Sequence, residues 1–279
     1  MKFYLSVFAT ILFISCQKTP VEIQTQEKTL YNISYGNDTA QRMDIYLPAN
    51  RSADSTRVLV IIHGGAYTSG DKTEFNAYIP SIKQKLPGYA IFNINYKLAA
   101  GNVNAFPTQE NDVKAALDFV VSKAAEYTVN GDKLVLLGAS SGAHLALLQA
   151  FKYPVPKVKA VVDFFGPTDF VTLYNAAPRF TQIGLQLLLS GTPVANPDVY
   201  SRSSPINFVG SDSPPTIIFH GQKDDIVPIS QSTSLKIKLD ASGVPNQIFI
   251  YPNESHGWFG ATLDDSFNKI AAFLLTHVA

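Results

Sequence analysis

Cysteine is almost absent from this chain of 279 residues, since only one occurs, at position 16. A single cysteine excludes a disulfide framework and a cysteine-rich metal site. An excess of charge of one sign is also lacking, because 22 basic residues balance 22 acidic ones. The sequence therefore has no electrostatic footprint for nucleic acid. With 46% apolar residues and only 16% charged ones, it is typical of a globular protein with a large buried core.

Long apolar runs are missing too, apart from a short one at the N-terminus. Lys2 precedes residues 3–15, which are uncharged and mostly apolar but too few to span a bilayer as a helix. The run has the length of the h-region of a secretory signal, and its end, Phe13-Ile14-Ser15-Cys16, resembles the lipobox of bacterial lipoproteins. We therefore expect a lipoprotein-type signal peptide at 1–15, lipidation at Cys16 and a tether at 16–30. A plain secretion signal is the alternative.

This N-terminus predicts where the protein acts. We expect an exported protein at a bacterial cell envelope, either on the outer membrane or facing the periplasm. Contact with the membrane is expected only through the N-terminal lipid anchor.

Residues 31–279 alternate short apolar runs with helical patterns, which predicts one α/β domain. The runs are near-continuous in Val, Ile, Leu and Phe, as in strands buried on both faces; they are 57–62, 90–95, 134–137, 158–164, 216–219 and 247–251. Helices are expected within 106–127 and at 141–151, 229–241 and 263–278. This order predicts a mostly parallel central sheet flanked by helices on both faces, after one or two antiparallel strands within 31–47. Residues 170–215 break the rhythm, contain six prolines and are expected to cap the site.

One motif points to nucleophilic catalysis. Gly138-Ala139-Ser140-Ser141-Gly142 has the G-x-S-x-G pattern and lies between a predicted strand and a predicted helix. In that context a tight turn holds the serine above the carboxyl edge of the sheet, next to a helix N-terminus that favours negative charge. Ser140 is therefore predicted to be a nucleophile. A Gly/Ser-rich turn without chemistry is the alternative.

A nucleophilic serine needs a base, and four histidines follow Ser140 in the chain. His144 lies one turn into the following helix and is expected to pack against the sheet. His220 ends a predicted strand, where local hydrogen bonding is expected, and His277 belongs to the last helix. His256 lies in a loop directly after the last predicted strand, and we predict that it is the base.

The base needs an orienting acid, for which three carboxylates are candidates. Asp224 and Asp225 lie in a loop between a predicted strand and a predicted helix. Adjacent side chains point in different directions, so only one of the two should contact His256. Asp169 follows the preceding strand, where a turn or helix cap is the favoured interpretation. These residues alone leave Asp224 and Asp225 as alternatives.

A glycine-containing segment, His63-Gly64-Gly65-Ala66-Tyr67, leaves another buried strand. Glycine lets the backbone approach a scissile carbonyl, so the N–H groups of Gly65, Ala66 and Ser141 are predicted to form an oxyanion hole. A phosphate-binding loop is excluded, because neither G-x-G-x-x-G nor a G-K-[ST] ending is present.

Taken together, the chain resembles the α/β-hydrolase carboxylesterase/lipase family, in particular bacterial feruloyl- and acetylxylan-esterase-like lipoproteins, over about residues 31–279. The segments that carry the resemblance are His63-Gly64-Gly65-Ala66-Tyr67, the Ser140 motif, His220-Gly221-x-x-Asp224-x-x-Val227-Pro228 and Ser255-His256-Gly257. The alignment selects Asp224 rather than Asp225. Three departures occur: Lys97 stands where arginine is usual, and Ala66 and Ala143 stand where glycine is common.

The resemblance implies a serine carboxylic-ester hydrolase with a Ser140-His256-Asp224 triad and a covalent acyl-enzyme. Its substrate is expected to be a small-molecule or glycan-linked ester, such as an acetyl, feruloyl or other acyl ester. No cofactor and no metal are expected.

Aromatic residues beside these motifs are candidates for substrate contact. Tyr67, Trp258 and Phe259 are predicted to line the substrate site, with ordinary core packing as the alternative. Two other functions stay open: a serine peptidase of the prolyl-oligopeptidase type, and a catalytically idle α/β-hydrolase that binds a ligand.

Overall fold

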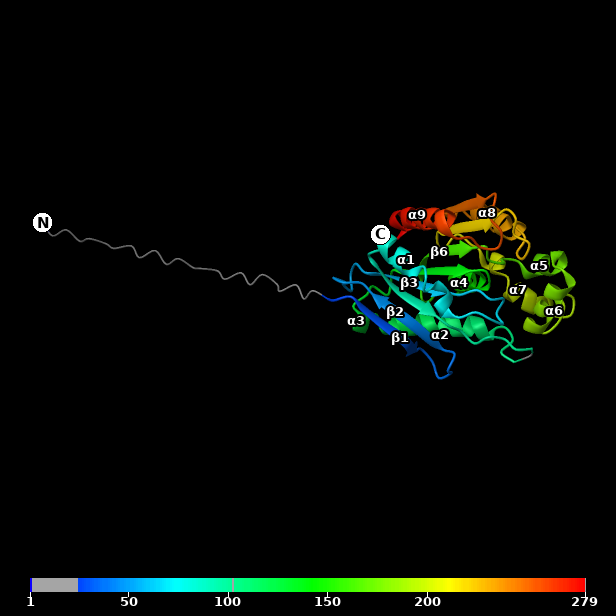
Figure 1. Ribbon diagram of the computed structural model, residues 1–279, viewed down its shortest axis with the longest axis horizontal. Coiled ribbons are helices and arrows are strands. Elements are labelled where there is room, and N and C mark those ends of the chain that lie inside the picture. The colour runs from blue at the N-terminus through cyan, green and yellow to red at the C-terminus, as the bar shows by residue number, and fades with distance from the viewer. Residues whose placement is uncertain (2–24, 102, 279) are drawn as a thin grey trace.

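One mixed sheet of eight strands runs through the centre of the molecule (Figure 1). The computed structural model describes Met1 and residues 25–101 and 103–278, so the expected signal peptide and Cys16 lie outside the described residues. The strands lie in the order β1-β2-β4-β3-β5-β6-β7-β8. Their bounds are β1 (Lys28–Ser34), β2 (Arg42–Leu47), β3 (Arg57–Ile62), β4 (Tyr89–Ile94), β5 (Leu134–Ala139), β6 (Val158–Phe164), β7 (Thr216–Gly221) and β8 (Asn246–Tyr251).

The sheet is antiparallel at one edge and parallel elsewhere. Strand β2 pairs with β1 and β4 in antiparallel register, and every further pair from β4 to β8 is parallel. The predicted α/β fold with a mostly parallel sheet is therefore confirmed. The prediction of a tether at 16–30 is wrong for residues 28–30, because β1 begins at Lys28, which pairs with Leu47 of β2.

Helices cover both faces of the sheet. Their bounds are α1 (Ile79–Lys85), α2 (Thr108–Ser122), α3 (Ala124–Tyr127), α4 (Ser141–Lys152), α5 (Phe170–Ala176), α6 (Arg179–Leu188), α7 (Pro197–Arg202), α8 (Ser230–Ala241) and α9 (Gly260–His277), with short 3₁₀ helices η1 (Lys72–Phe75) and η2 (Pro205–Phe208). Helices α2, α4 and α8 pack on one face, and α1 and α9 pack on the other. In the part of the chain that the structure describes, no helix is both long and apolar enough to cross a membrane.

The central strands show why the apolar runs are almost continuous. In β3, Val58 and Val60 belong to the core on the α4 side, whereas Leu59 and Ile61 belong to the core on the α9 side. All four side chains are fully buried. Successive side chains of a strand point to opposite faces, so a strand covered on both faces needs apolar residues at every position.

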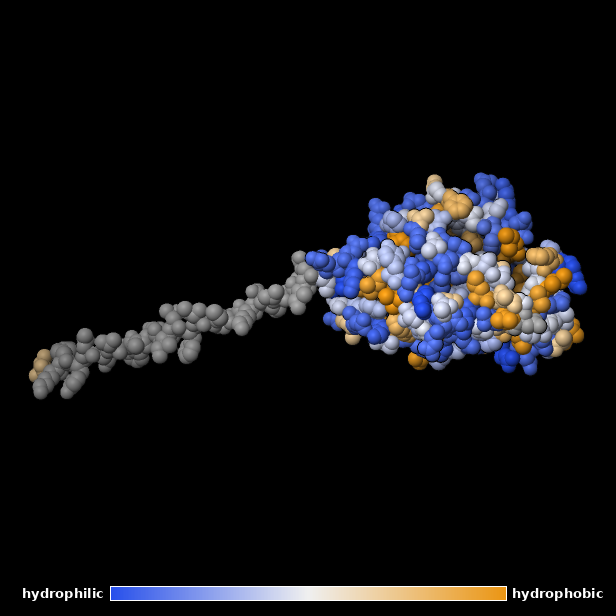
Figure 2. Space-filling model, turned by 60° about the horizontal axis from the view of Figure 1, so that its bottom comes forward, coloured by the Kyte–Doolittle hydropathy of each residue, from blue (hydrophilic) through white to orange (hydrophobic). Residues whose placement is uncertain are grey.

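Residues 170–215 form three helices and η2 at one end of the molecule (Figure 1). Within α6, Leu185 and Leu188 are buried, but Phe180, Ile183 and Leu187 are exposed. Figure 2 shows hydrophobic residues gathered at this end of the surface. The segment is thus a helical extension of the domain, and one face of α6 exposes apolar side chains to solvent.

Candidate active site

Ser140 occupies the turn between β5 and α4. Its backbone has φ 54° and ψ −122°, which is unfavourable for a residue with a side chain. The turn is held by a hydrogen bond from Ser140 N to Phe164 O (2.9 Å) and by one from His144 N to Ser140 O (3.0 Å). These contacts stabilise the strained turn that carries the hydroxyl.

The two glycines of the motif are required by close backbone contacts. A Cβ atom at Gly138 would lie 2.3 Å from Gly142 C, and one at Gly142 would lie 2.1 Å from Ile62 O. No side chain fits at such distances without moving the backbone. The G-x-S-x-G pattern therefore reflects how tightly the turn packs against β3.

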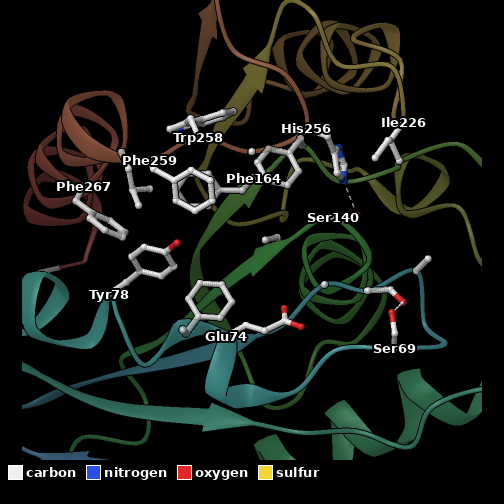
Figure 3. A pocket seen from close by; sticks show the side chains of 18 residues that line it. Ser69, Glu74, Tyr78, Ser140, Phe164, Ile226, His256, Trp258, Phe259 and Phe267 are labelled. Atoms are coloured by element: carbon white, nitrogen blue, oxygen red, sulfur yellow. Dashed lines mark hydrogen bonds between the residues drawn. The ribbon is translucent and has the colours of Figure 1, made fainter.

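Three of the predicted side chains form a chain of hydrogen bonds. Ser140 Oγ lies 2.9 Å from His256 Nε2 (Figure 3). On the other side of the ring, His256 Nδ1 lies 2.7 Å from Asp224 Oδ2. Asp224 follows β7 and His256 follows β8, so both reach Ser140 from the carboxyl ends of neighbouring strands. The Asp224 carboxylate only accepts hydrogen bonds, so the proton of the neutral His256 ring lies on Nδ1. Nε2 is then free to accept a hydrogen bond from the serine hydroxyl.

The Asp224 carboxylate is buried and well satisfied. Its Oδ1 accepts hydrogen bonds from the backbone N–H groups of Ile226 and Val227, each at 2.9 Å, and its Oδ2 lies 3.2 Å from His220 Nε2. Burial alone would raise the pKa of this carboxyl. The hydrogen-bond donors of His220, His256 and Val227 outweigh burial and hold the pKa well below its ordinary value.

His220 connects Asp224 to the core. Its Nδ1 lies 2.7 Å from Ser232 Oγ, and its Nε2 lies 2.9 Å from Val227 O. A carbonyl oxygen only accepts, so Nε2 carries a proton that faces both Val227 O and the Asp224 carboxylate. The local bonding expected for His220 is present, and the structure adds its contact with the acid.

The remaining candidates lie elsewhere. Asp169 caps α5 by accepting from Val171 N and Thr172 N, and Asp225 is exposed. His144 is fully buried, with Nε2 2.7 Å from Ser203 O, and burial lowers its pKa to about 4. The expectation that His144 packs against the sheet needs correction, because its ring stacks on Phe170 of α5 at 4.5 Å between centroids.

The loop after β3 approaches the serine closely. A Cβ atom at Gly64 would lie 3.4 Å from Ser140 Cβ, and Gly65 has φ 103°. Within the described residues, the N–H groups of Gly65 and Ala66 have no hydrogen-bond acceptor. Ser141 N lies at the start of α4, where helix geometry leaves the N–H groups without a helical partner. The backbone donors predicted for an oxyanion hole thus belong to two segments that meet at Ser140.

These groups open onto a pocket of about 540 Å³ (Figure 3). Ser140, His256 and residues 64–66 form one part of its wall. The rest is mostly aromatic and aliphatic, contributed by Phe75, Tyr78, Phe164, Phe165, Ile226, Trp258, Phe259, Leu263 and Phe267, together with the small residues Ser69, Ala139 and Gly257 and the acidic Glu74. The pocket is therefore suited to an apolar group of a substrate.

Two predicted pocket features need correction. Tyr67 does not line the pocket; it is buried against His144 and Phe170, with ring centroids at 5.6 and 6.3 Å. The predicted cap, residues 170–215, contributes no residue to the pocket wall. Trp258 and Phe259 do line the pocket, Trp258 largely buried and Phe259 exposed.

Sequence reasoning missed the wall formed by Glu74, Phe75 and Tyr78. These residues follow the loop after β3 but belong to no motif. The one available signal was the pair of aromatic residues soon after that loop. Among the described residues, no group of three or more His, Cys, Asp or Glu side chains is arranged to hold a metal ion.

A buried carboxyl behind the site predicts a pH-dependent stability. Asp163 is fully buried at the end of β6; its Oδ1 accepts from Gly166 N at 2.8 Å, and burial raises its pKa from 3.8 to about 7. The unfolded chain releases this proton near its ordinary pKa, so the wild type should lose stability as pH rises from about 4 to about 7. The Asp163→Asn variant should escape that loss and gain up to about 4 kcal/mol over the wild type across this range.

Thermal unfolding of both proteins from about pH 4.5 to about pH 8 measures the effect. Asp118→Asn, at an exposed position, serves as the control. A gain for Asp163→Asn that is the same at every pH would show that Asp163 is not protonated in the folded state.

Comparisons with known proteins place the chain in a family. The BD-FAE family model matches residues 43–239. The probable carboxylic ester hydrolase LipM of Mycobacterium tuberculosis is 31% identical over 215 residues, which cover 72% of this chain and 49% of LipM. The chain spans about half the length of the first curated relatives that it matches.

Two solved structures are similar at 28% identity and each covers 88% of this chain. One is a bifunctional GH43-CE protein of Bacteroides eggerthii, with a TM-score of 0.77 and 38% of its own chain covered. The other is a truncated carbohydrate esterase from gut microbiota, with a TM-score of 0.76 and 96% of its chain covered. The family model covers more than half of this chain, so the chain belongs to the BD-FAE family of α/β-hydrolases.

Proposed function

We propose that this protein is a serine carboxylic-ester hydrolase that forms an acyl-enzyme on Ser140. The observation that carries the proposal is the hydrogen-bonded series Ser140–His256–Asp224, which opens onto an apolar pocket. Beside it lie backbone N–H groups that have no hydrogen-bond acceptor in the part of the chain that the structure describes. Nucleophile, base and orienting acid within hydrogen-bond reach are what acyl transfer requires.

The reaction proceeds in two halves. Ser140 Oγ attacks the ester carbonyl while its proton passes to His256 Nε2, and the N–H groups of Gly65, Ala66 and Ser141 bind the resulting oxyanion. His256 then gives the proton to the departing alkoxide, which leaves an acyl group on Ser140. Water, deprotonated by His256, attacks this acyl group, and collapse of the second tetrahedral species releases the carboxylic acid and restores Ser140.

Asp224 acts through His256. Its ionised carboxylate accepts from Nδ1–H, fixes the tautomer of the ring and stabilises the imidazolium that forms in each half. His220 and the backbone N–H groups of Ile226 and Val227 hold this carboxylate in place. His220 is therefore a positioning residue in this proposal.

The substrates proposed are acyl esters of glycans, such as acetyl and feruloyl esters. The support is the similarity to a bifunctional GH43-CE protein and to a gut-microbial carbohydrate esterase. The mostly apolar pocket is large enough for an aromatic acyl group. Anchoring through Cys16 at a bacterial envelope would place the enzyme where external glycans are encountered.

Labelling with a fluorophosphonate probe, followed by peptide mapping, tests the nucleophile. We expect one adduct, on Ser140, which is lost in Ser140→Ala and His256→Ala but kept in Ser122→Ala, a change at an exposed serine of α2. Such probes react with activated serine nucleophiles, so the adduct depends on the base as well as on the hydroxyl. A folded wild-type protein that stays unlabelled would refute the proposed function and favour a ligand-binding role.

Turnover assays separate the ester and peptide alternatives. p-Nitrophenyl acetate, p-nitrophenyl butyrate and methyl ferulate should be hydrolysed, whereas an aminoacyl-proline p-nitroanilide should not. Cleavage of the anilide without cleavage of the esters would instead identify a peptidase of the prolyl-oligopeptidase type.

A further inference from the structure

Glu74 is an exposed residue that places a negative charge at the wall of the pocket. Among the residues that line the pocket, it is the only acidic residue, and neither lysine nor arginine is present. Within the described part of the chain, the Glu74 carboxylate has no hydrogen-bond or ion-pair partner. Figure 3 shows it across the pocket from Trp258, between Tyr78 and Ser69. An unpaired charge therefore faces a site that is otherwise mostly apolar.

The backbone that carries Glu74 is firmly anchored. Lys72, the first residue of η1, forms a buried ion pair with Asp44 at 3.0 Å. Its backbone N–H donates to Asn95 Oδ1, and its carbonyl accepts from Asn93 Nδ2, each at 2.6 Å. Together these three contacts hold the backbone at Lys72, two residues before Glu74. Glu74 is consequently presented to the pocket from a rigid segment.

The charge of Glu74 also influences His63, at the start of the loop after β3. Burial lowers the pKa of His63, the residue before Gly64, and the negative charge of Glu74 is one of the influences that oppose this lowering. A negative charge in this place cannot stabilise an oxyanion. It repels a negatively charged group of a bound substrate and attracts a positively charged one.

We propose that Glu74 is a specificity-determining residue that selects against esters bearing a negative charge in the part that occupies the pocket. The proposal rests on the ester-hydrolase function proposed above. Two unit charges a few ångström apart repel measurably even near water, and more strongly beside apolar walls. The pocket thus accepts neutral and cationic acyl groups and disfavours hemiesters of dicarboxylic acids.

A matched pair of substrates tests this selection. p-Nitrophenyl valerate and the mono-p-nitrophenyl ester of glutaric acid have equally long acyl chains, but only the second ends in a carboxylate. The measured quantity is the ratio of kcat/KM for the glutarate to kcat/KM for the valerate. In Glu74→Gln this ratio should rise about 5- to 20-fold at low salt, and in Glu74→Lys it should rise further.

Salt and a remote charge provide the controls. In the wild type, added salt should raise the ratio because it screens the repulsion, whereas in Glu74→Gln salt should have little effect. Asp118→Asn removes the same charge from an exposed position on α2, outside the pocket wall, and should leave the ratio unchanged.

The outcomes separate the two proposals. If the wild type hydrolyses valerate and the ratio is the same in Glu74→Gln, the charge selection is refuted while the ester-hydrolase function stands. If the wild type hydrolyses neither ester and takes up no fluorophosphonate, both proposals fail. A rise of the ratio in Glu74→Gln that salt reproduces in the wild type supports the selection.

Discussion

Replacing Ser140 with alanine is expected to lower kcat on p-nitrophenyl esters by about 10⁵- to 10⁶-fold. Among the described residues, the Ser140 hydroxyl is the nucleophile that His256 Nε2 contacts, at 2.9 Å, so its loss leaves water to attack the carbonyl directly. The change removes one oxygen and keeps the Cβ atom, so the strained turn at φ 54° should persist. Steady-state kinetics, with circular dichroism and thermal unfolding beside them, measure both expectations.

The control for this prediction lies in the same protein. Ser122→Ala removes a hydroxyl from an exposed position on α2 and should leave kcat within about twofold of the wild type, as expected for a surface change. If Ser140→Ala kept more than about a tenth of the wild-type kcat, Ser140 would not be the nucleophile.

The central strands were predictable because burial on both faces leaves a near-continuous apolar run in the sequence. Such a run can be recognised without knowing which strand pairs with which. The predicted runs 57–62 and 158–164 coincide with β3 and β6. The run at 134–137 ended early, because Gly138 and Ala139 belong to the serine motif and have little strand propensity. In the structure they complete β5 by pairing with Asp163 and Phe164 of β6.

The helices between 170 and 215 were not predictable in the same way. Six prolines indicated a break in regular structure, but Pro197 and Pro205 lie in the first turn of α7 and η2. Proline is favoured there, because its missing N–H would have no helical partner anyway and its φ suits a helix. The helices are also short, and α1 with 7 residues escaped prediction for the same reason.

The catalytic candidates come from local motifs, whereas the pocket wall depends on tertiary packing. Ser140, His256 and Asp224 follow strand ends, and a parallel sheet brings such ends together. The residues alone therefore predicted Ser140 and His256, whereas the choice of Asp224 over Asp225 came from the family resemblance. Tyr67 was misplaced because Ala66 and Tyr67 both have positive φ, 50° and 67°, within a turn that carries the Tyr67 ring into the core. The sequence gives no sign of such a turn, because residues that carry side chains rarely adopt a positive φ.

Replacing Asp224 with asparagine is expected to lower kcat by about 10⁴-fold while the fold is kept. An asparagine amide that donates toward His256 Nδ1 would force the proton onto Nε2, the atom that must accept from Ser140 Oγ. The variant would also lack the negative charge that stabilises the imidazolium. Kinetics on a p-nitrophenyl ester from about pH 5 to about pH 9 measure the loss.

The neighbouring Asp225 offers a matched control, because Asp225→Asn removes the same charge one residue away from an exposed side chain. We expect it to keep kcat within about threefold of the wild type, as a surface change should. Equal losses of kcat in Asp224→Asn and Asp225→Asn would mean that the loop, rather than the carboxylate on His256, sustains catalysis.

The pKa of Asp224 is held well below its ordinary value, so its charge stabilises the folded protein above the unfolded pKa of about 4, and this contribution is lost as pH falls further. The stability deficit of Asp224→Asn should therefore be full near neutral pH and shrink below about pH 4.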